Sequence, residues 1–331
     1  MRIYRYALFM IVFLMLDGCQ EDDVFLSDIQ EVVENNDEYD WRSKQNAWIF
    51  SQMRKNYFWA DDLKDSLEYD YALEPSVFFE SMILPEDRFS YCERYDGYRF
   101  QKKNIPLNAT VLLDTIYLSK DRHIGYFVYD EFASEADITD VVLKFKSKGI
   151  DELVIDLRDN PGGLLITCKH LASLILPVKN LGELFCTYRY NSFLTRELIR
   201  TTGSPYEFSY FNRDNLTRNR NLNLSRVFFL VNRRSASCSE LLINALRPYM
   251  QTIVIGETTT GKDVGMKACY GSKYMYKLMP VTFRTYNASG DSVATTGIVP
   301  DIYKETVSGA KLGNIEEPLL KTALDYITTG K

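Results

Sequence analysis

Three serines and a cysteine lie together in the stretch "SASCSE" at residues 235–240, directly before a segment that is predicted to be a helix. A serine hydroxyl is a weak nucleophile, and it attacks a carbonyl only when a neighbouring base takes its proton. The chain contains only two histidines, the residue type that most often serves as that base. The stretch therefore raises the question of nucleophilic chemistry with a different base.

Lys262 is the strongest candidate for that base. It follows a predicted strand in the Gly/Thr-rich loop "GETTTGKDVG" (256–265), whereas His123 lies within a strand pattern and His170 in a helix with no obvious carboxylate to orient it. A lysine accepts a proton only when neutral, so its pKa must lie about 3 below the ordinary value of about 10.4, a change worth about 4 kcal/mol. The chemistry therefore requires a dry pocket around Lys262.

A third segment, "VIDLRDNPGG" (154–163), is a predicted buried strand that ends in an Asp-Asn-Pro-Gly-Gly turn. Gly162 and Gly163 allow close approach of the backbone, and the free N–H groups of such a turn can point into a cleft. Plain turn glycines would give the same pattern. Arg158 and Asp159 in this turn fit a structural ion pair at least as well as a contact with substrate.

Strands and helices alternate through the part of the chain that carries these three segments. "SEADITDVVLKFKSKG" predicts a helix that Ser134 and Asp137 open and Gly149 ends, with Ile138, Val142 and Phe145 on one face. The predicted strands are "HIGYFVY", "DELVIDL", "RVFFLVN" and "TIVIGE", and the other predicted helices are "ITCKHLASLIL" and "CSELLINALRPYM". This alternation predicts an α/β core with parallel strand pairs.

Residues 41–97 are predicted to form a small N-terminal helical domain. Ile49, Met53 and Tyr57 recur at helical spacing and give one apolar face. "LEPSVFFESMIL" predicts a second short helix, and "PEDRFSY" closes the domain.

The first forty residues predict export and a membrane tether. Residues 1–19 resemble a lipoprotein signal peptide: two arginines precede a ten-residue apolar run, and Leu16-Asp17-Gly18-Cys19 resembles a lipobox whose Cys19 would be lipidated. Asp17 departs from the small residue usual there, and an ordinary cleaved signal or a short anchor remains an alternative. Residues 20–40 carry nine acidic and no basic residues and are predicted to be a solvated tether.

An acidic cluster directly behind the lipid-bearing cysteine also resembles the surface-export signal of one group of Gram-negative bacteria. We therefore expect an exported outer-membrane lipoprotein, displayed either in the periplasm or on the cell surface. The net charge is −6 and no basic stripe is present, so no nucleic-acid partner is expected. The six cysteines include no C-x-x-C pair and no His/Cys cluster with metal-ligand spacing, so no structural metal is expected either.

In their order along the chain, "VIDLRDNPGG", "SASCSELLINALRPY" and "GETTTGKDVG" resemble the carboxyl-terminal processing (tail-specific) proteases. These are serine peptidases with a Ser/Lys dyad on a ClpP/crotonase-like core. The resemblance covers residues 110–331, and the unit with "WIFSQMRKNYFWADD" and "PEDRFSY" is similar to the N-terminal segment of lipoprotein members. Three ordered motifs are a specific signal, whereas any one alone is weak.

The resemblance implies roles for individual residues. Ser237 matches the nucleophile and Lys262 the general base. The backbone N–H of Cys238, with that of Gly162 or Gly163, would form the oxyanion hole. Glu240 matches an acidic position near the family's site. No metal or organic cofactor is implied, and the expected partners are a protein or peptide substrate and, through the lipid, the membrane.

Two departures from the family pattern stand out. Residues 98–109 form a short linker where members usually carry a PDZ domain, so the reader of substrate tails is expected to be absent. Some members also place a third polar residue four positions after the lysine, where this chain has Met266. Substrate choice, activity level and oligomeric state stay open at this stage.

Several alternatives remain for the individual residues. Ser237 and Glu240 also fit a capping box at a helix start, a role that can coexist with nucleophilic chemistry. Ser235 and Ser239 fit the register of the nucleophile less well, a Cys238 thiol paired with His170 is a remote option, and Lys262 could be a surface lysine.

For the whole chain, the rival to a membrane-anchored serine endopeptidase is a non-catalytic surface lipoprotein that binds peptides or glycans. Chemistry on CoA thioesters fits poorly, because it would leave the serine and the lysine without a role.

Overall fold

The computed structural model describes residues 41–95, 110–119, 122–307 and 309–330. The predicted signal peptide with Cys19, the acidic tether at 20–40 and the linker at 98–109 lie outside these ranges. Among the residues that are described, no helix combines the length and the apolar character needed to cross a membrane.

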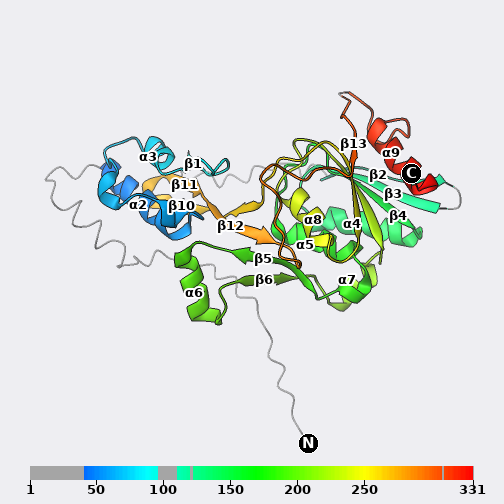
Figure 1. The fold of residues 1–331 in the computed structure, drawn as a ribbon, viewed down its shortest axis with the longest axis horizontal. Helices are drawn as coiled ribbons and strands as arrows, with labels where there is room; N and C mark the ends of the chain where they lie inside the picture. Colours follow the sequence, from blue (N-terminus) through cyan, green and yellow to red (C-terminus); the bar gives the residue numbers. More distant parts are fainter. Residues whose placement is uncertain (1–40, 96–109, 120–121, 308, 331) are drawn as a thin grey trace, which may run out of the picture.

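A mixed sheet forms the centre of the larger of two units (Figure 1). Within the described ranges its strand order is β13 (Ile302–Tyr303), β8 (Gln251–Gly256), β7 (Arg226–Val231), β4 (Glu152–Asp156), β3 (Arg122–Tyr129) and β2 (Val111–Ser119). All neighbours pair in parallel except β2 and β3, which pair antiparallel. The predicted α/β class with parallel pairs is therefore confirmed.

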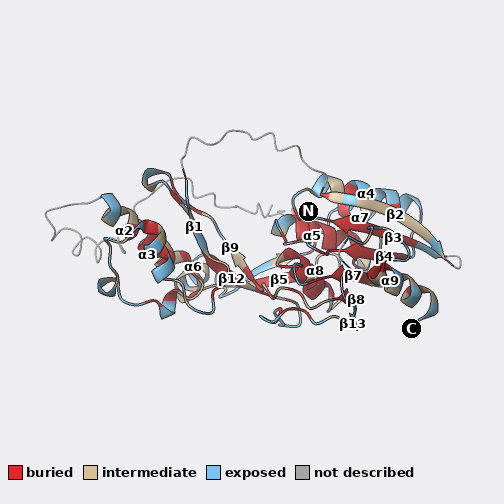
Figure 2. Cartoon of the chain, turned by 90° about the horizontal axis from the view of Figure 1, so that it is seen from above, coloured by how far each residue is buried: buried red, intermediate tan, exposed pale blue. Residues whose placement is uncertain are grey.

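Helices cover both faces of this sheet. α4 (Glu135–Ser147), α5 (Leu165–Ile175) and α8 (Cys238–Leu246) lie on one face, and α9 (Pro318–Thr329) lies on the other. Strand β4 is buried along its whole length because Leu153 and Ile155 pack toward the first set of helices while Val154 packs toward α9. Figure 2 shows these central strands and the inner helix faces as one buried core.

Helix α4 begins and ends where its sequence predicts. The Ser134 hydroxyl accepts a hydrogen bond from the Asp137 N–H at 3.3 Å, which satisfies one free donor of the first turn. The predicted apolar face, Ile138, Val142 and Phe145, is buried against the sheet. Of the predicted helical face near the N-terminus, Ile49 and Met53 lie in α2 (Trp41–Asn56) and are fully buried. Tyr57 is also fully buried, but it follows the last residue of this helix.

A second, antiparallel sheet extends from the larger unit. Its strand order is β6 (Glu207–Tyr210), β5 (Leu184–Arg189), β12 (Val281–Tyr286) and β9 (Val264–Met266). Two helices that the sequence analysis did not predict, α6 (Ser192–Thr202) and α7 (Asn215–Arg220), lie between β5 and β7 along the chain. Strand β9 begins two residues after Lys262, so this sheet holds one end of the loop that carries that lysine.

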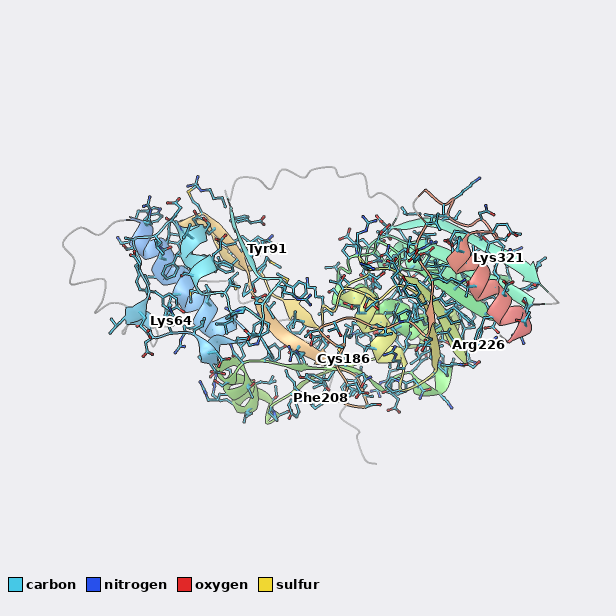
Figure 3. The ribbon with its side chains drawn as sticks, turned by 45° about the horizontal axis from the view of Figure 1, so that its top comes forward. Lys64, Tyr91, Cys186, Phe208, Arg226 and Lys321 are labelled. Atoms are coloured by element: carbon cyan, nitrogen blue, oxygen red, sulfur yellow. The ribbon has the colours of Figure 1, made fainter. Side chains whose placement is uncertain are left out.

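In its described residues, the N-terminal unit contains two α-helices, two short 3-10 helices and a small sheet. It comprises α2 (Trp41–Asn56), α3 (Pro75–Ser81), β1 (Tyr91–Arg94) and two strands from much later in the chain, β10 (Cys269–Gly271) and β11 (Tyr276–Met279). Leu278 and Cys269 complete its apolar core, which residues 41–95 do not close by themselves. In Figure 3 this unit carries the labels Lys64 and Tyr91, and β12 connects it with the larger unit, where Arg226 and Lys321 are labelled.

Candidate active site

The turn after β4 is shaped by the Asn160 side chain. Asn160 is fully buried; its amide nitrogen donates to Tyr129 O at 2.8 Å and its amide oxygen accepts from Gly162 N at 2.9 Å. A hydrogen bond to the second following N–H is the local turn that asparagine favours. The Gly162 N–H is therefore already hydrogen-bonded within the turn. The asparagine two positions before Gly162 in "DNPGG" is the sequence signal for this bond.

Gly162 and Gly163 both have positive φ values, +107° and +139°. A Cβ added to Gly162 would lie 2.7 Å from Ser237 Cβ and 2.9 Å from Cys238 N, so the glycine turn and the start of α8 are in direct contact. Within the described ranges, neither Gly163 N–H nor Cys238 N–H donates a hydrogen bond. The contact between the two segments is thus flanked by one unoccupied N–H group from each of them, that of Gly163 and that of Cys238.

Ser237 precedes α8 with φ +56° and ψ −113°, a backbone conformation that non-glycine residues rarely adopt. Such strain persists only where the surroundings impose it, and it is common at functional sites. The serine N–H donates to Glu240 Oε2 at 3.0 Å, in the capping box that the sequence predicts. Its side chain therefore projects from a fixed and strained turn.

The neighbours of Ser237 are held by other contacts. Ser235 Oγ donates to Leu157 O at 2.8 Å, and Ser239 Oγ donates to Asn160 O at 3.1 Å; both serines are fully buried. The Cys238 thiol donates to Gly163 O at 3.2 Å and belongs to the buried core. Of the three serines, only Ser237 is partly exposed.

Glu240 connects the serine turn with the lysine loop. Its buried carboxylate accepts from Gly261 N at 2.7 Å, from Lys262 N at 2.8 Å and from the Thr259 hydroxyl, in addition to the Ser237 N–H. Hydrogen bonds to a carboxylate are stronger than those to a neutral acceptor, so this side chain holds its four donors firmly in place. Its geometry suits a structural anchor for both loops, and Thr259 is a member of this network that the sequence analysis missed.

The Lys262 amine lies in a partly buried position beyond this network. Nζ donates to Met266 Sδ at 3.4 Å and lies 5.1 Å from the centroid of the Phe89 ring. Burial lowers the pKa of Lys262, against the attraction of Cys238, Glu240 and Asp87, which raise it. In the described part of the chain no hydrogen bond joins Nζ to Ser237 Oγ, so the two residues share an anchor but not a direct contact.

The turn residues Arg158 and Asp159 do not pair with each other, contrary to one expectation. Arg158 is buried between Asp156, at 2.5 Å, and Glu317, at 2.7 Å. Asp159 pairs instead with Arg234 at 2.7 Å. The two side chains do not meet because they point to different sides of the turn. Arg158 points into the core and toward Glu317 at the start of α9, whereas Asp159 points toward Arg234.

Within the described residues, the hydrogen bonds of the two histidines go to residues other than Ser237. His123 is exposed in β3, and His170 bonds to the Thr139 hydroxyl at 2.9 Å. His170 also lines an open cavity of about 490 Å³ between α4, α5 and α7, to which neither Ser237 nor Lys262 contributes. The described residues contain no group of three His, Cys, Asp or Glu side chains arranged to hold a metal ion.

The family model described as "Peptidase family S41" matches residues 123–304, which is more than half of the chain. A second family model, "Peptidase S41 N-terminal domain", matches residues 44–91. The chain belongs to peptidase family S41. The first region contains the glycine turn, the serine turn and the lysine loop, and the second contains most of α2, all of α3 and Phe89.

Named relatives of this S41 protein are processing proteases. It is 26% identical over 233 residues to a carboxyl-terminal-processing protease of Picosynechococcus sp., covering 66% of this chain and 50% of the relative. It is 27% identical over 208 residues to the carboxy-terminal processing protease CtpA of Bacillus subtilis, covering 61% of this chain and 40% of the relative. The chain thus spans about half the length of the curated relatives it matches.

Solved structures support the fold of this S41 protein. A putative S41 protease from Bacteroides fragilis superposes with a TM-score of 0.73 at 20% identity, covering 86% of this chain and 97% of that one. A putative peptidase from Parabacteroides merdae gives a TM-score of 0.55 at 16% identity, covering 88% and 98%. Likeness at these identities concerns the fold alone.

Proposed function

We propose that this chain is a serine endopeptidase in which Ser237 is the nucleophile and neutral Lys262 is the general base. The proposal rests above all on the Glu240 carboxylate, which binds the backbone N–H groups of Ser237 and Lys262 and so holds the two loops together. Family membership supports the reaction class, and the lowered pKa of Lys262 supports the choice of base. The core that carries them is proposed to be of the ClpP/crotonase type.

In the proposed reaction, Ser237 Oγ forms a bond to the peptide carbonyl carbon and its proton passes to Lys262 Nζ. The carbonyl oxygen gains negative charge and is bound by Cys238 N–H and Gly163 N–H, the two donors that have no other partner in the described residues. The C–N bond then breaks as Nζ returns the proton to the leaving amine. A water then gives a proton to Nζ as its oxygen bonds to the acyl carbon. The bond from that carbon to Ser237 Oγ breaks as Nζ passes the proton to Oγ, which restores the free serine and the neutral lysine.

This assignment favours Gly163 over Gly162 for the oxyanion hole, because Asn160 already accepts the Gly162 N–H. It also requires the Lys262 side chain to rotate from Met266 Sδ toward Ser237 Oγ when substrate binds. A lysine side chain has four rotatable bonds, and catalytic hydrogen bonds often tighten only in the substrate complex.

To test the dyad, the purified protein would be treated with a fluorophosphonate probe and with casein. We expect the probe to label Ser237, and we expect Ser237→Ala and Lys262→Ala each to lower casein cleavage by about 10⁴-fold or more. The matched control is Ser239→Ala, which removes a buried hydroxyl two positions away. Equal cleavage by the wild type and both dyad variants would refute the proposal.

The contact of Lys262 with Met266 supports a second candidate, a non-catalytic lipoprotein that binds peptides on a protease-like fold. The fluorophosphonate experiment separates the two, because a binding protein without an activated serine stays unlabelled at every pH. Retention of peptides by an unlabelled protein would favour this second candidate.

We also propose that lipidated Cys19 anchors the protein to the outer membrane, that residues 20–40 tether it, and that 98–109 replace a PDZ domain. The match to the N-terminal domain ends at residue 91 and the match to the peptidase family begins at residue 123, which supports a short connection between the two regions. Labelling with a palmitate analogue that is lost in Cys19→Ala tests the anchor. Protease treatment of intact cells tests the face of display: release supports the cell surface, and full protection contradicts it.

A further inference from the structure

Three consecutive residues of the N-terminal unit, Arg88 to Ser90, contact the part of the core that carries Lys262. Arg88 Nη2 donates to Gly261 O at 2.9 Å and to Thr295 O at 3.0 Å. The Phe89 ring lies 5.1 Å from Lys262 Nζ, and Ser90 Oγ accepts from Val281 N at 2.7 Å. Successive side chains of one turn thus contact the lysine loop, the lysine amine and the start of β12.

The Asp87 carboxylate gives this turn its shape. Oδ1 accepts from Phe89 N at 2.8 Å and from Ser90 N at 3.0 Å, a local turn typical of aspartate. Asp87 is buried, and its second oxygen has no hydrogen-bond partner among the described residues. The turn therefore directs Arg88 and Phe89 toward the core, with a buried carboxylate at its base.

Arg88 completes the restraint on the peptide that precedes Lys262. The Gly261 N–H donates to Glu240 in the core, and the Gly261 carbonyl accepts from Arg88 of the N-terminal unit. Gly261 itself has φ +79°, and an added Cβ would lie 2.2 Å from Thr295 O, so this loop packs tightly against 294–297. The position of the lysine backbone is thus set from both units.

Phe89 contacts the side-chain amine of Lys262, at the opposite end of that residue from its backbone. The centroid of its ring lies 5.1 Å from Nζ. An apolar cover disfavours the ammonium form, while the face of an aromatic ring attracts a cation and favours it. The titratable groups near Nζ, Cys238 and Glu240 from α8 and Asp87 from the turn, also favour the ammonium. Since burial is the largest influence and the pKa of Lys262 is lowered, exclusion of water outweighs these attractions.

We propose that Arg88 and Phe89 are positioning residues for Lys262, so that the N-terminal unit completes the base site of the core. This inference rests on the proposed role of Lys262 as general base. It gives the segment "DRFS" a function in the reaction, in addition to its structural role of closing the N-terminal unit.

The test compares Arg88→Ala and Phe89→Ala with two controls in the full-length protein. Arg54→Ala removes an arginine-to-carbonyl hydrogen bond inside the same unit, where Nη1 donates to Ala60 O at 3.0 Å. Phe208→Ala removes an exposed phenyl ring from β6. Phe89→Leu keeps an apolar cover over the amine and serves as the conservative variant.

Two readouts are needed. Competitive acetylation with acetic anhydride, followed by mass spectrometry across pH, gives the pKa of Lys262 without any need for turnover. The pH dependence of fluorophosphonate labelling at Ser237 gives the reactivity of the serine. We expect Phe89→Ala and Arg88→Ala to raise the pKa of Lys262 and to slow labelling at pH 7 by about tenfold for each unit of that rise, with recovery at pH 10.

Phe89→Leu should restore most of the wild-type profile, and the two controls should leave it unchanged even if they lower the melting temperature. An unchanged pKa of Lys262 in both alanine variants, or an equal change in Arg54→Ala, would overturn the inference. If wild-type Ser237 is not labelled at any pH, the proposed function fails, while the acetylation readout still decides whether Arg88 and Phe89 position Lys262.

Discussion

At the scale of single residues, the site depends on one buried carboxylate that accepts several hydrogen bonds. Glu240 is buried and holds backbone N–H groups from three residues, Ser237, Gly261 and Lys262. Charge-assisted hydrogen bonds of this kind contribute about 1.5–3 kcal/mol each. The same side chain therefore stabilises the fold and sets the separation of the two residues of the proposed dyad.

Glu240→Gln should reduce both stability and activity, because the new amide NH₂ group faces N–H donors and leaves at least one of them without an acceptor. We expect a loss of about 3 kcal/mol in the free energy of unfolding, measured by urea denaturation at constant m-value. Glu93→Gln, which breaks an exposed pair with Lys277, is the control and should cost at most about 1 kcal/mol. Equal losses in the two variants would contradict the anchoring role.

The pH dependence of the reaction should report Lys262. Burial lowers its pKa below the ordinary 10.5, so the fraction of neutral amine rises through a midpoint below that value. Serine labelling should therefore increase with pH along a single acid limb and reach a plateau once Lys262 is deprotonated. In Lys262→Ala this limb should vanish; a profile unchanged by the substitution would assign it to another group.

At the scale of elements, a strand exit and a helix start meet through two unusual backbone conformations. Gly162, after β4, and Ser237, before α8, both have positive φ, and a Cβ added to Gly162 would lie only 2.7 Å from Ser237 Cβ. β4 and β7 are adjacent parallel strands, so their carboxyl ends bring these two turns to the same edge of the sheet. The arrangement therefore follows from strand order.

Gly162→Ala tests this contact. The new methyl group would meet Ser237 Cβ and Cys238 N, in addition to the strain of a positive φ, and we expect a cost of about 3 kcal/mol together with loss of serine labelling. Gly149→Ala is the matched control, because Gly149 has φ +60° but nothing within 4 Å of its added Cβ. It should cost about 1–2 kcal/mol and leave labelling intact. Similar labelling in both alanine variants would contradict the contact.

At the scale of the whole molecule, distant segments complete both units. Arg158, from the turn that precedes the glycines, joins Asp156 to Glu317, which also caps α9 by accepting from Leu320 N at 2.9 Å. At the other end, β10 and β11 complete the N-terminal unit. The site turn is thereby tied to the C-terminal helix, and the lysine loop to the N-terminal unit.

Glu317→Gln should destabilise the protein because it leaves the buried Arg158 with one carboxylate in place of two and weakens the cap of α9. We expect a loss of about 3 kcal/mol in the free energy of unfolding. Glu316→Gln, at the neighbouring exposed position, removes only a surface pair with Lys321 and should change stability by less than about 1 kcal/mol. Thermal unfolding of the two variants side by side checks the difference, and matching melting temperatures would refute it.

The sequence by itself determined most elements of the core and the candidate residues of the site. Hydrophobic periodicity and capping residues predicted β3, α4, β4, α5, β7, α8 and β8, because these signals act over a few neighbouring residues. The glycine turn, Ser237, Glu240 and Lys262 were identified from motifs in order along the chain. The structure places them together, while the catalytic roles themselves stay predictions.

Only the tertiary structure decided which N–H groups are unoccupied, that Glu240 joins the serine turn to the lysine loop, and that Phe89 lies over the amine. It also decided that β11 pairs with β1 although nearly the whole core separates them in sequence. Pairing between such distant segments depends on the burial of shared apolar surface and on the directions that packed elements impose on side chains. No pattern within a short window of sequence carries that information.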